Sequence, residues 1–364
     1  MKLLLTVIIF FLPFISNADQ KSELNLLTWA DYIKPEIIKK FEDEYGIKVN
    51  VDYADNHYSL ESKIIAINNN YDVAVPTLAP FFMRQVQFGL FSPLDYSKFK
   101  NYQYIDHKVI AFERNASNSD RYAVPFMLDS VGIGYDHKKI IQIMPDAPVD
   151  SLKMIFDPEI VKEFSHCGVE ILDSSEEIFA LAFIYLGIDP NTILEEDLKK
   201  ASQLLYKIRP YINNINSNLY FNNLGSGDNC LVLGYSGDIV HAKKLSGQFH
   251  NELDIRYILP KEGSVITLDL LAIPTAAPHK DNAYKFIDFL MRPDINAEIA
   301  NAIGFTSPNL ASYPLIRKEL RENPNIYPLQ HKRDNFSTLK IPNSSFNRLR
   351  NRAWMKFLSD EGDN

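Results

Sequence analysis

Apolar and polar residues follow each other along the chain in a regular succession of strand-like and helix-like patterns. Residues 24–27 form a short apolar run typical of a buried strand, and from residue 35 onward apolar side chains recur at helical spacing opposite charged ones. The same succession predicts strands at residues 48–53 and 72–76 and helices at residues 59–67 and 81–88. Because strands and helices that alternate at this spacing are typical of βαβ units, we expect an α/β fold with a parallel sheet covered on both faces.

The rest of the chain repeats this rhythm and predicts a second lobe. Strands are expected at residues 122–126, 131–135, 169–172, 231–235, 255–259 and 265–273, and helices at 175–185, 194–209, 283–291, 295–303, 314–321 and 345–358. Because no obvious linker separates the two halves, we expect the chain to cross between lobes more than once. Residues 130–136 and 268–273 are the candidate crossings, and short paired crossings of this kind act as a hinge. The predicted lobes comprise residues 19–128 with 269–310, and residues 129–268 with 311–364.

Residues 1–18 have the pattern of a secretory signal peptide. Lys2 precedes an apolar run at residues 3–15, which is too short to span a bilayer comfortably, and small residues follow it up to Ala18. We expect cleavage after Ala18 and a mature protein that is soluble outside the cytoplasm. In that oxidising compartment an isolated pair such as Cys167 and Cys230 is more often bonded than free, although the separation of their Cα atoms decides the matter.

Charge and motif patterns weigh against several function classes. The formal net charge of −8 disfavours nucleic acid as a partner and suits cationic ligands. The sequence contains no glycine-rich phosphate loop and no His/Cys cluster with metal-ligand spacing, so no cofactor or metal is expected. Residues 234–237 resemble the start of a nucleophile elbow around Ser236, but Asp238 stands where that pattern needs glycine. A serine hydrolase is therefore a remote alternative, and we predict a protein that is not an enzyme.

The strand-to-helix loop after residue 27 is the first candidate ligand site. It brings together Trp29, Asp31 and Tyr32 at the carboxyl end of a predicted strand, where ligands bind in open α/β sheets. Two aromatic faces beside one carboxylate suit an organic cation. The alternative is that the two rings only pack the entry of the helix while the carboxylate faces water.

Three further carboxylates stand out by their positions. Glu177 follows a predicted strand, although Ser174 and Glu177 also have the spacing of a capping box. Asp238 opens a predicted helix, where the helix dipole alone favours an acid. Asp269 interrupts an apolar strand, and a buried carboxylate there needs a cation or an opening. Together these positions lie at the edges from which a cleft between lobes is built.

Several separated motifs give the chain a family resemblance. They are, in order, TWADYI, DVAVP, CGVEILDSSEEIFA with LGIDPN, GDNCLVLGYSGD, PKEG, FIDFLMRPD, RENPNIYP and NRLRNRAW. With these motifs the chain resembles the bacterial periplasmic polyamine-binding proteins, and most closely their putrescine-binding members. The resemblance implies a two-lobed, type II periplasmic binding fold that closes on a polyamine and delivers it to the permease and ATPase of an ABC importer. It also implies a monomer that works in the periplasm and is not inserted in the membrane, and a disulfide between Cys167 and Cys230.

The resemblance also implies a set of ligand contacts. The matching positions are Trp29, Ala30, Asp31, Tyr32, Thr77, Glu177, Tyr235, Asp238, Thr267, Asp269 and Phe305. Three of them depart from the family pattern: Thr267 replaces an aromatic residue, Phe305 a tyrosine, and Ala30 a small hydroxyl residue. Such a set suits a diamine, which has an ammonium at each end and an apolar middle. Our hypothesis is that Asp238 and Asp269 hold one ammonium, while Glu177 or Asp31 lies near the other.

Other ligands and roles stay open at this stage. Spermidine or another cationic amine could replace putrescine as the ligand. A binding protein that reports polyamines to a partner, rather than feeding an importer, would keep the same fold. The basic C-terminal helix with Arg348, Arg350 and Arg352 could suggest nucleic acid or membrane, but we expect it to dock on a lobe through Leu349, Trp354 and Phe357.

Overall fold

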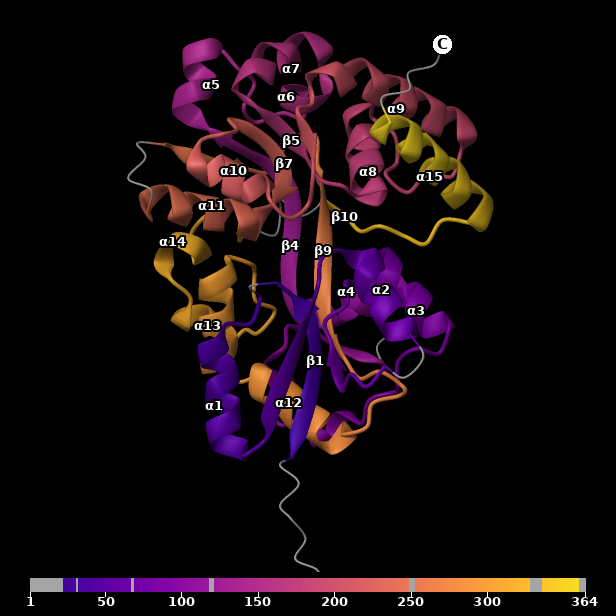
Figure 1. Ribbon diagram of the computed structural model, residues 1–364, viewed down its shortest axis with the longest axis vertical. Coiled ribbons are helices and arrows are strands. Elements are labelled where there is room, and N and C mark those ends of the chain that lie inside the picture. The colour runs from indigo at the N-terminus through magenta and orange to yellow at the C-terminus, as the bar shows by residue number, and fades with distance from the viewer. Residues whose placement is uncertain are drawn as a thin grey trace, which may run out of the picture.

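The computed structural model describes residues 22–30, 32–66, 69–117, 121–248, 253–327 and 336–359. The predicted signal peptide and Asp31 therefore lie outside the described residues. The chain forms two α/β lobes, one above the other in Figure 1, with the long strands β4 and β9 running between them. Neighbouring strands follow the order β2-β1-β3-β9-β4-β7-β5-β6, with β10 beside β9 and β8 beside β4.

The first lobe is built on the parallel strands β2, β1 and β3. Its elements are β1 (Glu23–Trp29), α1 (Pro35–Tyr45), β2 (Lys48–Ala54), α2 (His57–Ile65), β3 (Val73–Ala74), η1 (Leu78–Phe82), α3 (Met83–Gln87), η2 (Tyr96–Lys98), η3 (Tyr102–Tyr104), α4 (His107–Ser117), α12 (Lys280–Leu290), α13 (Pro293–Ile303), η6 (Tyr313–Leu315) and α14 (Lys318–Arg321). Helix α1 follows the sequence signals closely, because Pro35 occupies its first turn and Gly46 ends it in the left-handed conformation at φ 66°. Apolar clusters on both faces of the sheet form the core of this lobe.

The second lobe carries a single large apolar core. Its elements are α5 (His137–Ile143), α6 (Lys153–Phe156), α7 (Pro158–Phe164), η4 (Ser165–Cys167), β5 (Val169–Ile171), α8 (Ser175–Tyr185), α9 (Glu195–Ile208), η5 (Arg209–Tyr211), β6 (Asn214–Ile215), α10 (Tyr220–Ser226), β7 (Leu231–Tyr235), α11 (Ser236–Gln248), β8 (Ile255–Ile258), β10 (Phe336–Ser337) and α15 (Ser344–Leu358). Trp354 and Phe357 of α15 belong to this core, which confirms that the C-terminal helix docks on a lobe.

Two long strands connect the lobes. Strand β4 (Ala123–Asp136) pairs with β9 (Ser264–Ala272) over its first half and with β7 and β8 over its second half. The sequence pattern predicted two strands here, separated by residues 127–130. That prediction is wrong, because the backbone of these residues stays extended and continues the ladder with β9. The strand stays continuous because β7 and β8 take over as its pairing partners where the pairing with β9 ends. This change of partner depends on the whole fold, so the local sequence pattern does not reveal it.

The last part of the chain returns to the second lobe later than predicted. Ile316, Leu320 and Ile326 are buried in the core of the first lobe, together with residues of α1, α12 and α13. The prediction that the chain leaves the first lobe at residue 311 is therefore wrong, and residues 311–327 belong to it. From Phe336 onward the chain lies with the second lobe, where β10 pairs with the first residues of β9.

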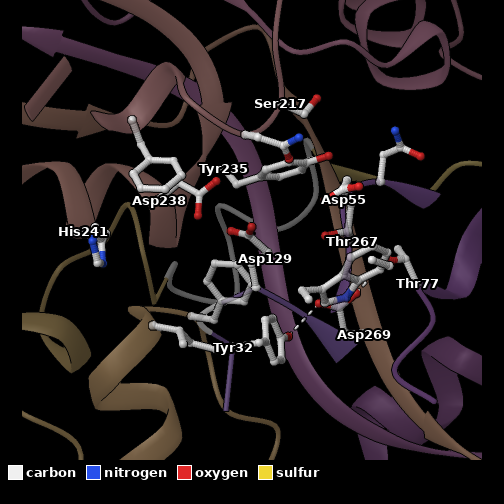
Figure 2. A pocket seen from close by; sticks show the side chains of 18 of the residues that line it. Tyr32, Asp55, Thr77, Asp129, Ser217, Tyr235, Asp238, His241, Thr267 and Asp269 are labelled. Atoms are coloured by element: carbon white, nitrogen blue, oxygen red, sulfur yellow. Dashed lines mark hydrogen bonds between the residues drawn. The ribbon is translucent and has the colours of Figure 1, made fainter. Parts of the chain in front are cut away.

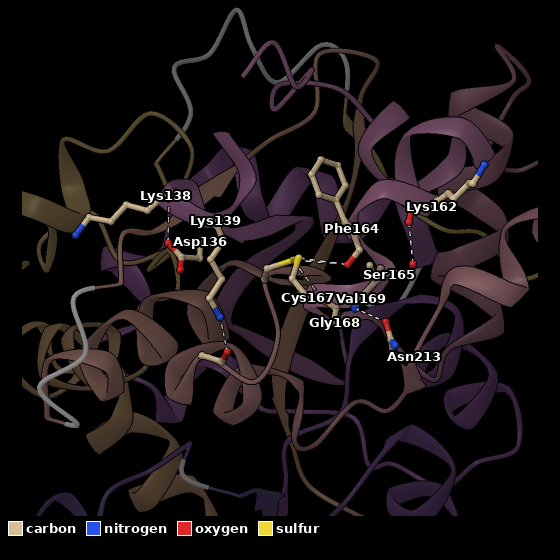
Figure 3. The surroundings of a disulfide bond; sticks show 12 residues. Asp136, Lys138, Lys139, Lys162, Phe164, Ser165, Cys167, Gly168, Val169 and Asn213 are labelled. Carbon is tan, nitrogen blue, oxygen red and sulfur yellow. Dashed lines mark hydrogen bonds between the residues drawn. A yellow bond between two sulfur atoms is a disulfide. The ribbon is translucent and has the colours of Figure 1, made fainter. Parts of the chain in front are cut away.

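Figure 3 shows the disulfide between Cys167 and Cys230, which confirms the expected pair. Cys167 ends η4 and Cys230 directly precedes β7, so the bond ties the start of β5 to that of its parallel neighbour. The Cα atoms are 5.5 Å apart, within the usual range for a disulfide.

Candidate ligand-binding site

A cavity of about 380 Å³ lies between the two lobes. Its wall takes residues from β1, β4, β9 and the loops of the first lobe, and from β7, α10 and α11 of the second. Of the predicted contacts, the following line it: Trp29, Ala30, Tyr32, Thr77, Tyr235, Asp238, Thr267, Asp269 and Phe305. Segments far apart in the sequence are thus brought to one place, as Figure 2 shows.

Asp269 forms the acidic centre on the side of the first lobe. The hydroxyl of Tyr32 donates to one of its carboxylate oxygens at 2.6 Å, and the hydroxyl of Thr77 donates to the other at 2.6 Å. Both donors are uncharged, so the negative charge remains uncompensated. Burial raises the pKa of Asp269 to about 6, against the lowering effect of these two hydrogen bonds.

Asp238 forms a second acidic centre, on the side of the second lobe. It lies in the first turn of α11 and accepts a hydrogen bond from the hydroxyl of Tyr220 at 2.6 Å. The backbone N–H of Tyr235 donates to the same hydroxyl at 2.9 Å, which fixes the direction of that bond. Burial raises the pKa of Asp238 to about 6.

The two acidic centres lie in different parts of the cavity. In Figure 2 the carboxylates of Asp238 and Asp269 are well separated, and that of Asp129 lies between them. This arrangement does not favour the hypothesis that Asp238 and Asp269 hold the same ammonium. It favours one cationic group at each.

Glu177 lies one layer behind the cavity wall. Its carboxylate accepts a hydrogen bond from the hydroxyl of Tyr235, at 2.9 and 3.1 Å from the two oxygens, and burial raises its pKa to about 7. Ser174 occupies the N-cap of α8 but its side chain makes no capping hydrogen bond there, so the capping-box interpretation is wrong. The set of residues that lines the cavity includes Ser174 and Tyr235 but not Glu177.

Aromatic rings supply the apolar part of the wall. Tyr32 packs its edge against Phe305, with ring centroids 5.6 Å apart, and Trp29 packs against His57 at 5.3 Å. Phe305 comes from the first lobe and lies directly over the start of α11, where a Cβ on Gly237 would meet its ring carbons at 2.0 Å. Only glycine at residue 237 lets the two lobes approach this closely.

The sequence pattern missed a further buried carboxylate in the wall, Asp129. This side chain is 6 % exposed, and its Oδ1 accepts hydrogen bonds from the backbone N–H groups of Ser130 at 2.7 Å and Ser236 at 3.0 Å and from the hydroxyl of Ser236. Residues 127–130 looked like a connection between strands, so the acid gave no signal. The other missed lining residues are Lys34, Ala54, Asp55, Asn56, His57, Asp173, Ser174, Ser217, Asn218, Phe221, Asn222, His241, Ala302 and Ile303.

The chemistry of the cavity is that of a receptor for a cation. Its buried acids are matched by neutral donors, so their charge is available to a positively charged ligand. Among the described residues, no three His, Cys, Asp or Glu side chains are grouped to hold a metal ion. Ser236, the candidate nucleophile, is only 2 % exposed, and its hydroxyl donates a hydrogen bond to Asp129.

Two lobes joined by paired strands around a deep acidic cavity define a solute-binding protein with the type II periplasmic binding fold. Residues 36–328 match the family model for bacterial extracellular solute-binding proteins, and the chain belongs to that family. Its members bind solutes and are not enzymes, in agreement with the prediction from the motifs. In the described parts of the chain, no helix has the length and apolar character needed to cross a membrane.

Two relatives match almost end to end. The chain is 38% identical over 344 residues to the putrescine-binding periplasmic protein PotF of Escherichia coli (strain K12), covering 94% of this chain and 92% of that protein. It is 36% identical over 345 residues to the putrescine-binding periplasmic protein SpuD of Pseudomonas aeruginosa (strain UCBPP-PA14), covering 94% of each. The fold matches the crystal structure of the spermidine/putrescine substrate-binding protein PotD from Streptococcus pneumoniae at TM-score 0.76 and 23% identity, over 94% of this chain and all of that one.

Proposed function

We propose that this protein is the periplasmic solute-binding component of an ABC importer and that it binds a polyamine, with putrescine as its ligand. One observation carries the proposal: Asp238 and Asp269 line one cavity from opposite sides, Asp269 is buried and Asp238 half-buried, and neutral hydroxyl groups are their hydrogen-bond donors. A diamine brings one ammonium to each acid. The relatives named as putrescine-binding support this choice of ligand.

The aromatic wall supports the same ligand class. The methylene chain of a diamine needs flat apolar surfaces between the two acids, and the rings of Tyr32, Tyr235 and Phe305 offer them. Thr267 offers no ring at its position, so we expect this side of the ligand to be held less tightly. An α-amino acid suits the cavity poorly, because its carboxylate would face the acids Asp129, Asp238 and Asp269.

A panel of amines tests the proposal. Purified mature protein is titrated by calorimetry with putrescine, cadaverine, spermidine, spermine, agmatine and arginine, and thermal unfolding is followed with each. Putrescine is expected to bind and to raise the melting temperature, while arginine leaves it unchanged. Binding of none of the amines would overturn the proposal.

The transport role needs a separate test, because a polyamine sensor would bind the same ligand. Deletion of the gene is expected to abolish high-affinity uptake of labelled putrescine, and re-expression is expected to restore it. Unchanged uptake alongside retained binding would favour sensing. Labelling of Ser236 by a serine-reactive fluorophosphonate would instead point to hydrolysis, and we expect none.

A further inference from the structure

Asp129 lies at a place where both lobes and both connecting strands meet. It sits on β4 directly opposite Thr267 of β9, and Asp269 lies two residues further along that strand. The carboxylates of Asp129 and Asp269 are therefore diagonal neighbours across a strand pair, a relationship that typically places the two residues about 7–8 Å apart. From the second lobe, Ser236 at the start of α11 donates two hydrogen bonds to Asp129.

Among the described residues, hydrogen-bond donors reach only one oxygen of this carboxylate. All three hydrogen bonds to Asp129 go to Oδ1, and within the described residues none joins Oδ2. The side chain lines the cavity although nine-tenths of it is buried, and in Figure 2 it points into the open space between Asp238 and Asp269. A carboxylate oxygen that accepts no hydrogen bond from the described residues, on a mostly buried side chain that lines a cavity, indicates a ligand group at that point.

The structural contacts of Asp129 do not explain its charge. The carbonyl oxygen of an asparagine could accept the same bonds from Ser130 and Ser236, without the cost of burying a negative charge. Burial raises the pKa of Asp129 well above its usual value, and the nearby negative charges of Asp238 and Asp269 raise it further. An acid in this position is favourable only when a cation comes to it.

The position of the free oxygen selects the kind of cation. A linear amine that reaches from Asp238 to Asp269 passes Asp129 with the middle of its chain. In a diamine that part is methylene, which offers Asp129 nothing. In a triamine it carries a secondary ammonium, which has N–H donors for Oδ2. We propose that Asp129 binds the internal ammonium of a linear triamine such as spermidine, and that it thereby extends the ligand range of the cavity beyond α,ω-diamines; this inference rests on the proposed polyamine-binding function.

The experiment compares two amines of equal length in two proteins. Spermidine and 1,8-diaminooctane have the same chain length, but the second has a methylene in place of the internal nitrogen. Calorimetry on the wild type is expected to show spermidine binding more tightly by at least about tenfold, the effect of one charge-assisted hydrogen bond. In Asp129→Asn this difference is expected to vanish, and spermidine is expected to lose more affinity than putrescine, which has no internal ammonium for this carboxylate.

Asp136→Asn is the matched control. Asp136 is a buried acid on the same strand that accepts backbone hydrogen bonds from Lys138 and Asp254 and does not line the cavity. Its substitution is expected to leave the preference for spermidine over 1,8-diaminooctane intact.

Three results would overturn the role of Asp129. They are equal binding of the two long amines by the wild type, binding of putrescine without spermidine, and an equal loss of putrescine and spermidine in Asp129→Asn. The first two use only wild-type protein, so a variant that fails to fold does not block the test. Failure of the proposed function is recognised separately, because the wild type then binds neither putrescine nor spermidine.

Discussion

The hydroxyl of Tyr235 donates a hydrogen bond to the carboxylate of Glu177 and so places this acid behind the cavity wall. The hydroxyl oxygen of Tyr235 lies 2.9 and 3.1 Å from the two carboxylate oxygens of Glu177, and Glu177 is 3 % exposed. The ring of Tyr235 itself lines the cavity. We therefore expect Glu177 to influence a ligand mainly through the position of this ring, unlike Asp238 and Asp269, which lie in the wall.

Substitution of Glu177 tests whether this acid lies behind the cavity wall or contacts the ligand directly. In Glu177→Gln the amide oxygen can still accept the hydrogen bond from Tyr235, so the ring stays in place. We expect putrescine affinity to fall by less than about threefold in calorimetry, since no direct charge-assisted contact is lost. A loss as large as that in Asp238→Asn would show that Glu177 contacts the ligand directly.

Asp238→Asn and Asp269→Asn are expected to change affinity and stability in opposite directions. Each removes a charged acceptor for one ammonium, and putrescine binding should weaken at least about tenfold. Each also removes a negative charge whose pKa is raised by desolvation, so the ligand-free variants should melt at a higher temperature than the wild type at pH 7. Calorimetry and thermal unfolding of the same preparations measure both effects. Unchanged affinity in both variants would overturn the site assignment.

The fold and the acidic site could be predicted from sequence to different extents. Strand and helix patterns are local, and the resemblance supplied nine of the 24 lining residues, among them Asp238 and Asp269. Asp129 escaped because its importance comes from pairing with Thr267 across β4 and β9, and no local pattern reveals that. The resemblance placed Glu177 among the ligand contacts. Its position behind Tyr235 depends on side-chain packing, which the sequence does not reveal.

Buried acids with raised pKa values predict a dependence of stability on pH. The pKa values of Asp238 and Asp269 are about 6 in the folded protein, against 3.8 for the free side chain. Between these values the folded state binds more protons than the unfolded state, so stability falls as pH rises from about 4 to 6. At pH 7 the two-unit difference costs roughly 3 kcal/mol per carboxylate. Glu177, with a pKa of about 7, acts in the same direction.

Ligand binding should show the opposite trend. A diammonium ligand needs ionised acids, so the rise in melting temperature caused by putrescine should shrink as the pH falls from 7 to 5. Over the same range the ligand-free protein should gain stability. Thermal unfolding with and without putrescine, in buffers of equal ionic strength, measures both. Parallel curves at all pH values would contradict the raised pKa values, and Asp238→Asn should flatten the ligand-free curve.

The disulfide should contribute to stability without affecting the cavity. Cys167 and Cys230 close a loop of 63 residues, and loop-closure entropy for this length corresponds to roughly 4 kcal/mol. Neither cysteine lines the cavity. The double variant Cys167→Ala, Cys230→Ala should therefore unfold at lower urea concentration but bind putrescine with unchanged affinity below its melting temperature. Weaker binding by the folded variant would show that the bond positions the site.

A buried ion pair behind the site gives the last prediction. Arg350 of α15 donates to Glu176 of α8 at 2.6 Å, and the two side chains are 9 % and 4 % exposed. Tyr58 of the first lobe donates to the same carboxylate at 3.1 Å, so Glu176 joins both lobes and the C-terminal helix. Among the described residues, removal of the arginine leaves this buried carboxylate with only the neutral hydroxyl donors of Tyr58 and Ser175. Arg350→Met should lower the free energy of unfolding by about 3–5 kcal/mol.

The exposed arginine two residues earlier is the matched control for this loss. Arg348→Met on the same helix should change the free energy of unfolding by less than about 0.5 kcal/mol. Adding Glu176→Gln to Arg350→Met removes the stranded charge and should restore part of the stability, because the cost comes from the unpaired acid. Urea unfolding of the four proteins measures these differences. Equal stability of the Arg350 and Arg348 variants would show that the pair adds nothing to the docking of α15.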